Sequence, residues 1–271
     1  MGIVFLNGEF LEASAARISP LDRGFLFADG VYEVIPCYHG RPLRLDAHLD
    51  RLQYSLDALR IPATQSRAEW AALFSELVAR NGGGNVSIYL QVSRGAPEKR
   101  DHAFPKVPVA PTVFAMVSPM ARPPLDDLDN ASCVRAITRN DIRWTRADIK
   151  SVSLLPNILL RQDAVEAGAA ECILLRDGCA TEGAASNLFI VAGGVLKTPP
   201  KSHYILGGIT RDLVIELALA NGIPVAECDI SEQELRRADE IWVTSSTREI
   251  VPVGELDGAK IGDGRPGPLW R

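Results

Sequence analysis

Apolar and polar residues recur along the chain with spacings that predict individual strands and helices. Residues 3–11 predict a hairpin that turns at its Asn-Gly pair, since this dipeptide favours tight hairpin turns. Residues 31–38 alternate as a strand does, with Val31, Glu33 and Ile35 on one face. The same reasoning predicts two helices and two further strands in the first half of the chain: helices over residues 45–59 and 67–80, strands over 86–93 and 111–118.

The second half of the chain has a pattern of its own, which follows a proline-rich interval. Residues 119–124 contain several prolines, and these favour a linker over a helix or a strand. Further strands are expected near residues 132–138, 171–175, 187–191, 224–227 and 240–244, and helices near 153–167, 210–221 and 231–237. The sequence therefore predicts an α/β (α+β) protein with a domain at residues 1–118 and another at 125–271.

Composition and charge exclude several classes of protein. The 271 residues are 46% hydrophobic and 23% charged, which is ordinary for a globular protein. The net charge of -5 argues against binding to nucleic acid, and no apolar run is long enough to cross a membrane. The start of the chain lacks the basic residues of a signal peptide. Five cysteines and four histidines are scattered, so we expect reduced thiols, no metal site and a cytoplasmic protein.

Lys150 differs from the other lysines in its sequence context. The chain has six lysines, and the other five lie in evident loops. Lys150 instead lies between Ile149 and an apolar run within residues 152–160. Desolvation penalises a charged ammonium group, so a lysine in such surroundings is more readily available as a free amine. A Schiff-base lysine needs such an amine; a solvated position or a pair with Asp148 is the alternative.

Two segments have the character of an anion site. In residues 205–212, two glycines precede Thr210, which is a good N-cap for the helix that follows. The start of a helix presents unpaired N–H groups and a positive dipole end, which suit a phosphate. Residues 244–247 are four hydroxyl residues at the end of a strand and suit the same anion. An ordinary capped helix and a polar loop are the alternatives.

Glu182 is the candidate acid of the second half. It stands in a turn of small residues that leads into an apolar strand. A carboxylate held in that turn is suited to hydrogen-bond a ring nitrogen and keep it protonated. The alternative is a glutamate that faces water, as most glutamates do.

A Schiff-base lysine, a phosphate site and an acid for a ring nitrogen are together what pyridoxal 5'-phosphate requires. The sequence also resembles the fold-type IV, or class IV, aminotransferases, and most closely the D-amino-acid transaminases. The resemblance covers nearly the whole chain. Six motifs in the family's order carry it: residues 27–34, 48–52, 148–151, 181–187, 206–211 and 243–250.

The resemblance implies an architecture and an assembly. It implies the two-domain fold of fold-type IV pyridoxal phosphate enzymes, with a small N-terminal α/β domain and a larger C-terminal pseudo-barrel domain that binds the cofactor. The cofactor is expected in the cleft between the domains. The resemblance also implies a homodimer, because the family builds its site across the subunit interface.

The resemblance further implies roles for individual residues around the cofactor. Lys150 would bind the cofactor covalently and carry the proton between Cα of the substrate and C4′ of the cofactor. Glu182 would hold the ring nitrogen protonated. Arg51 would grip the phosphate, for which its planar fork is suited. The rest of the phosphate site would be Ile209, Thr210 and Ser246.

Substrate binding is assigned by resemblance to a charged loop. D-amino-acid transaminases carry an Arg-x-His sequence there, contributed across the dimer interface, which binds the substrate α-carboxylate together with a tyrosine. Arg100 and His102 match this sequence, and Tyr32 would be the tyrosine that faces the substrate. Because the loop is slightly longer than the family's usual form, Lys99 is the alternative to Arg100. A solvated charged loop is the structural alternative.

Two departures from the family's pattern stand out. Ala184 and Ala185 replace hydroxyl residues that relatives often carry, which removes possible hydrogen bonds near the cofactor ring. The chain also stops at Arg271, where relatives usually continue into a C-terminal helix. The second departure indicates either a trimmed end or an incomplete sequence.

The resemblance implies transfer of an amino group from a D-amino acid, such as D-alanine or D-glutamate, to 2-oxoglutarate or pyruvate. Within the same fold, the alternatives are a branched-chain L-amino-acid transaminase, an (R)-amine transaminase and a lyase acting on aminodeoxychorismate. From another class, a carrier that binds the cofactor without turnover is the alternative. The presence of both Lys150 and Glu182 argues against a carrier, since a carrier needs no electron sink.

Overall fold

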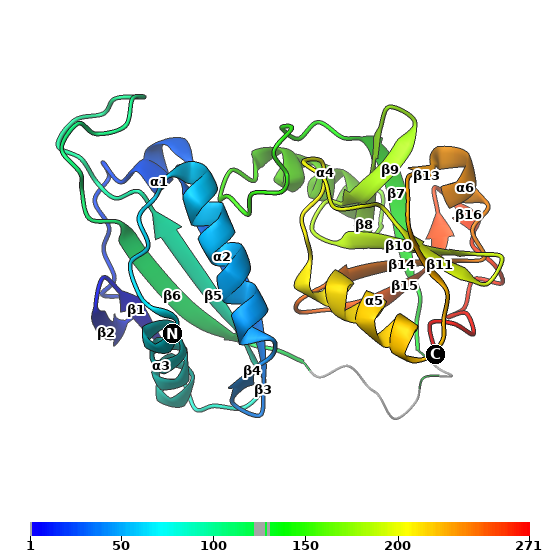
Figure 1. Ribbon diagram of the computed structural model, residues 1–271, viewed down its shortest axis with the longest axis horizontal. Helices are drawn as coiled ribbons and strands as arrows, with labels where there is room; N and C mark the ends of the chain where they lie inside the picture. Colours follow the sequence, from blue (N-terminus) through cyan, green and yellow to red (C-terminus); the bar gives the residue numbers. More distant parts are fainter. Residues whose placement is uncertain (1, 122–127, 129–130) are drawn as a thin grey trace. The chain divides into compact units, whose positions relative to one another are not determined.

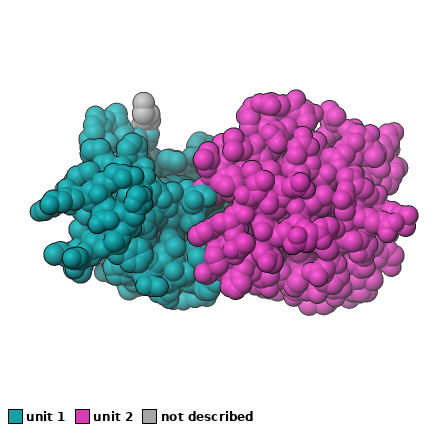
Figure 2. All heavy atoms as spheres, turned by 90° about the horizontal axis from the view of Figure 1, so that it is seen from above, with its two compact units in different colours: residues 1–122, 149–153 teal, residues 123–148, 154–271 magenta. Residues whose placement is uncertain are grey.

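The computed structural model describes the chain except for residues 1, 122–127 and 129–130. The chain divides into two compact units, coloured separately in Figure 2: unit 1 is residues 1–122 with 149–153, and unit 2 is residues 123–148 with 154–271. The expected linker, residues 119–124, lies partly outside the described residues. The domain boundaries expected from the sequence therefore stay a prediction.

Unit 1 is an antiparallel sheet with two long helices packed against it (Figure 1). Its described strands follow the order β2-β1-β6-β5-β3-β4. The strands are β1 (Ile3–Leu6), β2 (Glu9–Glu12), β3 (Gly30–Tyr38), β4 (Arg41–Pro42), β5 (Val86–Ser93) and β6 (Thr112–Pro119), and the helices are α1 (Arg23–Phe27), α2 (Leu45–Leu59) and α3 (Arg67–Arg80). The hairpin, helices and strands expected in this half of the chain are confirmed.

Local sequence explains where helix α3 begins. The Ser66 hydroxyl accepts a hydrogen bond from Glu69 N at 3.3 Å, and the Glu69 carboxylate accepts one from Ser66 N at 2.7 Å. This reciprocal capping box satisfies two N–H groups that the first helical turn leaves without partners. The buried face of α3 then packs into the core of unit 1 through residues such as Trp70 and Phe74, whose rings stack at 5.8 Å.

Strand β3 has the expected alternation of faces. Val31 and Ile35 are fully buried, and so is Glu33 between them. The strand pairs with β5 along its length, from Gly30 opposite Ser93 to Cys37 opposite Val86. A buried carboxylate is costly unless it is hydrogen-bonded and paired with a charge. Glu33 therefore needs a hydrogen-bonded, positively charged partner inside unit 1.

Unit 2 contains a large mixed sheet. The described residues form ten strands in the order β12-β11-β10-β14-β15-β7-β8-β9-β13, with β16 paired to β15. The strands are β7 (Val134–Asn140), β8 (Glu171–Arg176), β9 (Cys179–Gly183), β10 (Asn187–Ala192), β11 (Val195–Thr198), β12 (Val225–Glu227), β13 (Ile230–Ser231), β14 (Glu240–Ser245), β15 (Glu249–Leu256) and β16 (Ala259–Lys260).

Among the described residues of unit 2, the helices beside this sheet are α4 (Leu155–Glu166), α5 (Ile209–Ala220) and α6 (Glu232–Arg236). Helix α5 buries Val214 and Ala218 against Phe189 and Trp242 of the sheet. Helix α4 contributes Leu160 and Ala164 to a separate cluster with strand β8. In the part of the chain that the structure describes, no helix has the length and apolar character needed to span a membrane.

The sequence pattern does not reveal every strand. Strand β15 contains Pro252 and Gly254, which usually argue against a strand. Here Pro252 lies opposite Trp242, and the register with β7 shifts between Val253 and Glu255, as at a β-bulge. A Cβ on Gly254 would lie 2.6 Å from that of Cys133, so the close approach of the chain at this point needs glycine.

Replacing Phe74 by alanine should destabilise the protein strongly. Phe74 is fully buried in the core of unit 1, and truncating a buried phenylalanine costs about 3–5 kcal/mol of unfolding free energy. Urea unfolding followed by circular dichroism measures the loss. The matched control is Phe25→Ala, because the Phe25 side chain is 70% exposed. Equal losses in the two variants would contradict the proposed core.

Candidate functional site

The residues singled out from the sequence fall into two groups, one in each unit. Each group is built by elements of its own unit. The group in unit 1 is Tyr32, Arg51, Arg100, His102 and Lys150. The group in unit 2 is Glu182, Ile209, Thr210 and Ser246.

Lys150 is positioned by backbone pairing with strand β3. Lys150 O accepts a hydrogen bond from Tyr32 N, and Val152 N donates to Gly30 O, both at 3.0 Å. Val31 and Ser151 form an antiparallel bridge between these two bonds. Lys150 N also donates to the Ser55 hydroxyl at 3.2 Å. The backbone of Lys150 is thus fixed to strand β3 and helix α2 of unit 1.

The Lys150 side chain lies over an aromatic ring. Its Nζ is 4.1 Å from the centroid of the Tyr32 ring, a geometry that favours a cation through the ring's quadrupole. The sequence leads one to expect instead that the apolar run at residues 152–160 buries Lys150. That expectation is wrong, because Leu155 and Ile158 are themselves 67% and 60% exposed and Lys150 is only half-buried.

Arg51 is held by the buried carboxylate of Glu33. Arg51 Nε donates to Oε1 at 2.8 Å, and Nη2 donates to Oε2 at 2.7 Å. His48 Nδ1 lies 2.8 Å from the same Oε2. His48 and Arg51 are three positions apart on α2, so both reach Glu33 from one face of that helix. A two-bond pair of this kind fixes the plane of the guanidinium group.

The charges in this cluster shift two pKa values. Burial opposes ionisation of Glu33, but the positive charge and hydrogen bonds of Arg51, together with His48, outweigh it and lower its pKa to about 2. Burial lowers the pKa of His48 despite its bond to Glu33, and the nearby charges of Arg51 and Lys150 lower it further. The cluster therefore holds an ionised carboxylate against Arg51 at neutral pH.

Arg100 and His102 lie together on an exposed loop of unit 1. The Arg100 guanidinium is 4.7 Å from the centroid of the Phe27 ring, and the His102 ring is 5.2 Å from the same ring. Lys99, the alternative to Arg100, is also exposed. In the described residues, Phe27 is thus a shared support for the two side chains expected to bind a carboxylate.

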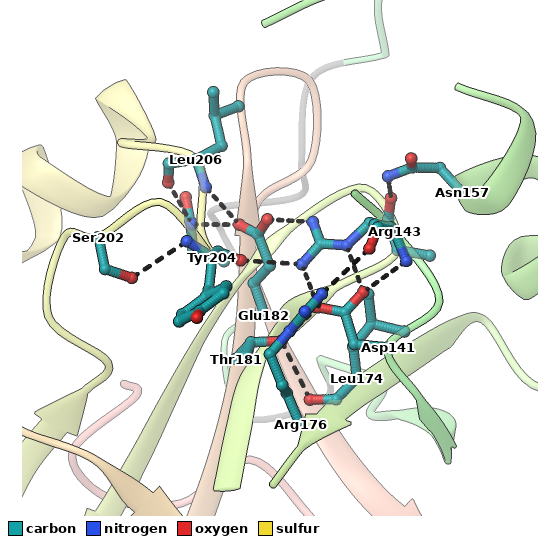
Figure 3. Close-up of polar contacts among 12 residues, drawn as sticks. Asp141, Arg143, Asn157, Leu174, Arg176, Thr181, Glu182, Ser202, Tyr204 and Leu206 are labelled. Atoms are coloured by element: carbon teal, nitrogen blue, oxygen red, sulfur yellow. Dashed lines mark hydrogen bonds and ion pairs between the residues drawn. The ribbon is translucent and has the colours of Figure 1, made fainter. Parts of the chain in front are cut away.

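Glu182 lies on strand β9 and is buried, with only 4% of its surface exposed. The expected position in a turn is therefore wrong, as is the alternative of a glutamate facing water; the turn follows at residues 184–186. Its Oε2 accepts a hydrogen bond from Leu206 N at 3.0 Å (Figure 3). The same oxygen accepts another from Asn187 Nδ2 at 2.9 Å. Its Oε1 contacts Arg143 Nη1.

Arg143 is shared between two carboxylates. It donates to Glu182, and it donates through Nε and Nη2 to both oxygens of Asp141 at 2.9 Å (Figure 3). Burial raises the pKa of Glu182 to about 7, against the lowering effect of Arg143 and Leu206 N–H. Arg143 carries one positive charge and shares it between Asp141 and Glu182, so the negative charge of Glu182 is neutralised only in part. Glu182 can therefore accept a further hydrogen bond from a cationic N–H group.

The start of helix α5 has the features of an anion site, with one correction. The N-cap is Gly208 and the helix begins at Ile209, so the expectation that Thr210 caps the helix is wrong. Among the described residues, no side chain caps this helix, and the N–H groups of its first turn lack intrahelical partners. A Cβ at Gly208 would lie 1.8 Å from Asn187 Oδ1, which places the helix start beside a hydrogen-bond partner of Glu182.

The hydroxyl residues at 244–247 span the end of β14 and the turn that follows. Ser246 is half-buried in this turn. Thr244 lies in the strand opposite Asn187. Within the described part of the chain, its buried hydroxyl oxygen has no hydrogen-bond partner. A buried polar atom without a partner is rare and indicates a missing ligand or water.

These features fit the chemistry of pyridoxal 5'-phosphate. A positioned lysine amine suits an aldehyde, and the uncapped start of α5 suits a phosphate. The buried Glu182 carboxylate, neutralised only in part by Arg143, suits a protonated ring nitrogen. Glycine at position 208 leaves room for the Asn187 side chain, which donates a hydrogen bond to Glu182.

Several residues of these clusters are not identified from the sequence. Glu33 has a recognisable signal, because a glutamate between two buried positions of a strand must find partners. Asn187 lies within a quoted motif but has no assigned role there. Arg143 and Asp141 lie outside the motifs, and nothing in their spacing relates them to Glu182, which is 39 positions from Arg143.

Comparison with known sequences gives a consistent result. A family model described as amino-transferase class IV matches residues 30–256. The D-alanine aminotransferase of Bacillus licheniformis is 42% identical over 269 residues, which covers 99% of this chain and 93% of that protein. The D-alanine aminotransferase of Staphylococcus aureus (strain MW2) is 40% identical over 268 residues, covering 99% of this chain and 94% of that protein.

Comparison with solved structures supports the fold. The branched-chain amino acid aminotransferase of Escherichia coli superposes with a TM-score of 0.89 at 28% identity, covering 99% of this chain and 91% of that chain. Another branched-chain enzyme, solved in complex with N-(5'-phosphopyridoxyl)-L-glutamate, gives 0.88 at 28% identity, with coverage of 99% and 90%. The expected fold-type IV architecture is confirmed.

Replacing Glu33 by glutamine should make the free energy of unfolding less dependent on pH in the acidic range. The pKa of Glu33 in the folded protein is about 2, below its ordinary value of 4.5. Ionised Glu33 therefore stabilises the fold above pH 4.5, and this contribution, on the order of 3 kcal/mol, is lost as the pH falls toward 2. Urea unfolding at several pH values measures it. Parallel profiles for the wild type and Glu33→Gln would contradict the assignment.

Proposed function

The chain belongs to the class IV aminotransferases, and from that premise we propose that it transfers the amino group of D-alanine or a similar D-amino acid to 2-oxoglutarate or pyruvate. With D-alanine and 2-oxoglutarate, the donor leaves as pyruvate and the acceptor becomes D-glutamate. The amino group and hydrogen on the donor Cα are exchanged for the oxo oxygen of the acceptor, so no oxidant or reductant is consumed.

One observation carries the choice of substrate. The chain is 42% identical to the D-alanine aminotransferase of Bacillus licheniformis along nearly the whole length of both proteins. Identity to the branched-chain enzymes of known structure is 28%. The sequence relation thus favours a D-amino acid as the donor.

Class IV aminotransferases use pyridoxal 5'-phosphate, which when bound supplies an electron sink for the substrate carbanion. Lys150 binds this cofactor through Nζ. The same nitrogen then moves the proton between Cα of the substrate and C4′ of the cofactor. The pairing of residues 150–152 with β3 supports this role, since a proton carrier has to be held in a defined position.

Other residues bind and orient the cofactor. The Glu182 carboxylate accepts a hydrogen bond from the N–H group of the cofactor ring and keeps the ring nitrogen protonated. Arg51, fixed in plane by Glu33, binds the phosphate. The phosphate site is completed by the N–H groups of Ile209 and Thr210 and by the hydroxyl of Ser246. Support comes from the uncapped helix start and from the preference of anions for the N-terminal end of a helix.

Arg100 and His102 bind the α-carboxylate of the substrate, and Tyr32 faces the substrate. An arginine fork and a histidine donor suit a carboxylate, and both side chains are exposed on their loop. The protein acts as a homodimer in which this loop serves the site of the other subunit. We place it in the cytoplasm, where free cysteines such as the five of this chain stay reduced.

A branched-chain L-amino-acid transaminase is the second candidate. The similarity to branched-chain enzymes of known structure, with TM-scores of 0.88 to 0.89, favours it as an alternative within the fold. The two candidate functions differ in the chirality of the amino acid that donates the amino group and in its side chain. Both differences are resolved by one substrate panel.

The panel measures transfer from D- and L-amino acids to 2-oxoglutarate. We expect D-alanine to be a good donor and L-leucine and L-valine to be poor ones. In the same assay Lys150→Ala should lose at least about 10³-fold in rate, because both the covalent link and the proton carrier are gone. Faster transfer from the branched-chain L-amino acids would favour the second candidate. Full activity of Lys150→Ala would contradict the role of Lys150.

A further inference from the structure

One arginine holds the backbone of the loop that carries Arg100 and His102. Arg23 Nη1 donates to the carbonyl oxygens of Asp101 at 2.5 Å and Ala103 at 3.1 Å, and Nη2 donates to His102 O at 3.1 Å. Three consecutive carbonyl groups of the loop thus converge on one guanidinium group. Arg23 itself is buried, with 4% of its surface exposed.

Arg23 is fixed in turn by Asp29. Arg23 Nε donates to Asp29 Oδ2 at 2.7 Å, and Arg94 Nε donates to the same oxygen at 2.8 Å. Burial opposes ionisation of Asp29, but the hydrogen bonds and charges of Arg94 and Arg23 outweigh it and lower its pKa. Arg94 also donates to Leu59 O and Arg60 O at 2.6 and 2.9 Å, at the end of α2. The support is therefore connected to the core elements of unit 1.

The side chains of the loop rest on the same support. The Arg100 guanidinium lies 4.7 Å from the centroid of the Phe27 ring, and Arg23 lies 4.9 Å from it. The His102 ring is 5.2 Å from Phe27. Just after His102 in the same loop, the Phe104 ring packs on Arg94: the Arg94 guanidinium lies 3.7 Å from its centroid. The backbone is thus anchored while Arg100 and His102 stay exposed.

We propose that Arg23 is a positioning residue for substrate specificity, which holds the Arg100–His102 loop in the conformation that binds the α-carboxylate. The proposal rests on the proposed function, because it takes the carboxylate as the ligand of this loop. A flexible loop that has to be ordered on binding weakens affinity by the entropy of ordering, and a preorganised loop avoids that loss. Arg23 supplies the preorganisation from outside the carboxylate site.

A positioning role has a kinetic signature that a general structural role lacks. Loss of the anchor weakens binding of the carboxylate, so KM for D-alanine rises while kcat at saturation changes little. The affinity for pyridoxal 5'-phosphate stays unchanged, because none of these loop residues contacts the cofactor in the proposed site. A variant that merely loosens the fold lowers kcat and cofactor affinity as well.

The test uses Arg23→Lys in the full-length protein with its cofactor. Lysine keeps the positive charge beside Asp29 but lacks the planar fork that reaches three carbonyl groups. The control is Arg17→Lys. Arg17 is exposed and donates to Ser14 O and Ala16 O at 2.6 and 2.8 Å, so this variant alters arginine–carbonyl bonds elsewhere.

Steady-state kinetics and limited trypsin digestion provide independent readouts. For Arg23→Lys we expect KM for D-alanine to rise about tenfold and kcat to change by less than about twofold. Trypsin cleavage after Lys99 or Arg100 should be about tenfold faster, because a loop without its anchor opens more often. Arg17→Lys should match the wild type in both readouts.

A second variant separates the backbone from the side chains. Phe27→Leu removes the ring under Arg100 and beside His102 but leaves the bonds of Arg23 to the loop. It should raise KM for D-alanine while the trypsin cleavage rate stays close to the wild-type rate. Such a result supports an orienting role for Phe27 on an anchored loop.

The outcomes distinguish this proposal from the proposed function. Unchanged KM and unchanged cleavage in Arg23→Lys would overturn the positioning role even if the wild type transaminates D-alanine. So would a fall in kcat and cofactor affinity as large as the change in KM. If the wild type transfers no amino group from any D-amino acid, the proposed function fails and the carboxylate role fails with it, whereas cleavage rates still decide whether Arg23 anchors the loop.

Discussion

The pairing of residues 150–152 with strand β3 is the interaction on which the candidate site of unit 1 depends. It brings Lys150 to Tyr32, although the two are far apart in the sequence, by means of ordinary backbone hydrogen bonds. The same strand carries Glu33, which faces the other way into the core and holds Arg51. Because successive residues of a strand point to opposite faces, Tyr32 and Glu33 leave β3 on opposite sides, and each contacts a different side chain: the Tyr32 ring lies under the Lys150 amine, and Glu33 binds Arg51.

Buried carboxylates paired with arginines recur in both units. Glu33 holds Arg51, Asp29 holds Arg23 and Arg94, and Asp141 and Glu182 share Arg143; each group consists of side chains that are largely withdrawn from water. Such pairs add little net stability, because desolvation offsets much of the attraction, but breaking one is costly. Their value lies in geometry, because each guanidinium group is held in a defined plane and position.

The local part of this structure follows from the sequence. Helices α2 and α3 have the expected bounds because an apolar stripe and a capping box act within a few residues. Strand β9, which carries Glu182, is not predicted from the sequence, because this short segment of small residues lacks the alternation that identifies a strand. Arg143 with Glu182, and Arg23 with the loop carbonyl groups 78 to 80 positions away, depend on tertiary contacts that no local pattern encodes.

The proposed function of this protein rests on the proposal that Lys150 binds the cofactor. Borohydride reduction of the protein loaded with pyridoxal 5'-phosphate fixes the cofactor on the lysine that binds it, and peptide mapping then identifies that lysine. We expect the label on the peptide that contains Lys150 and on no peptide containing another of the six lysines. A label on a different lysine, or no label at all, would contradict the proposed site.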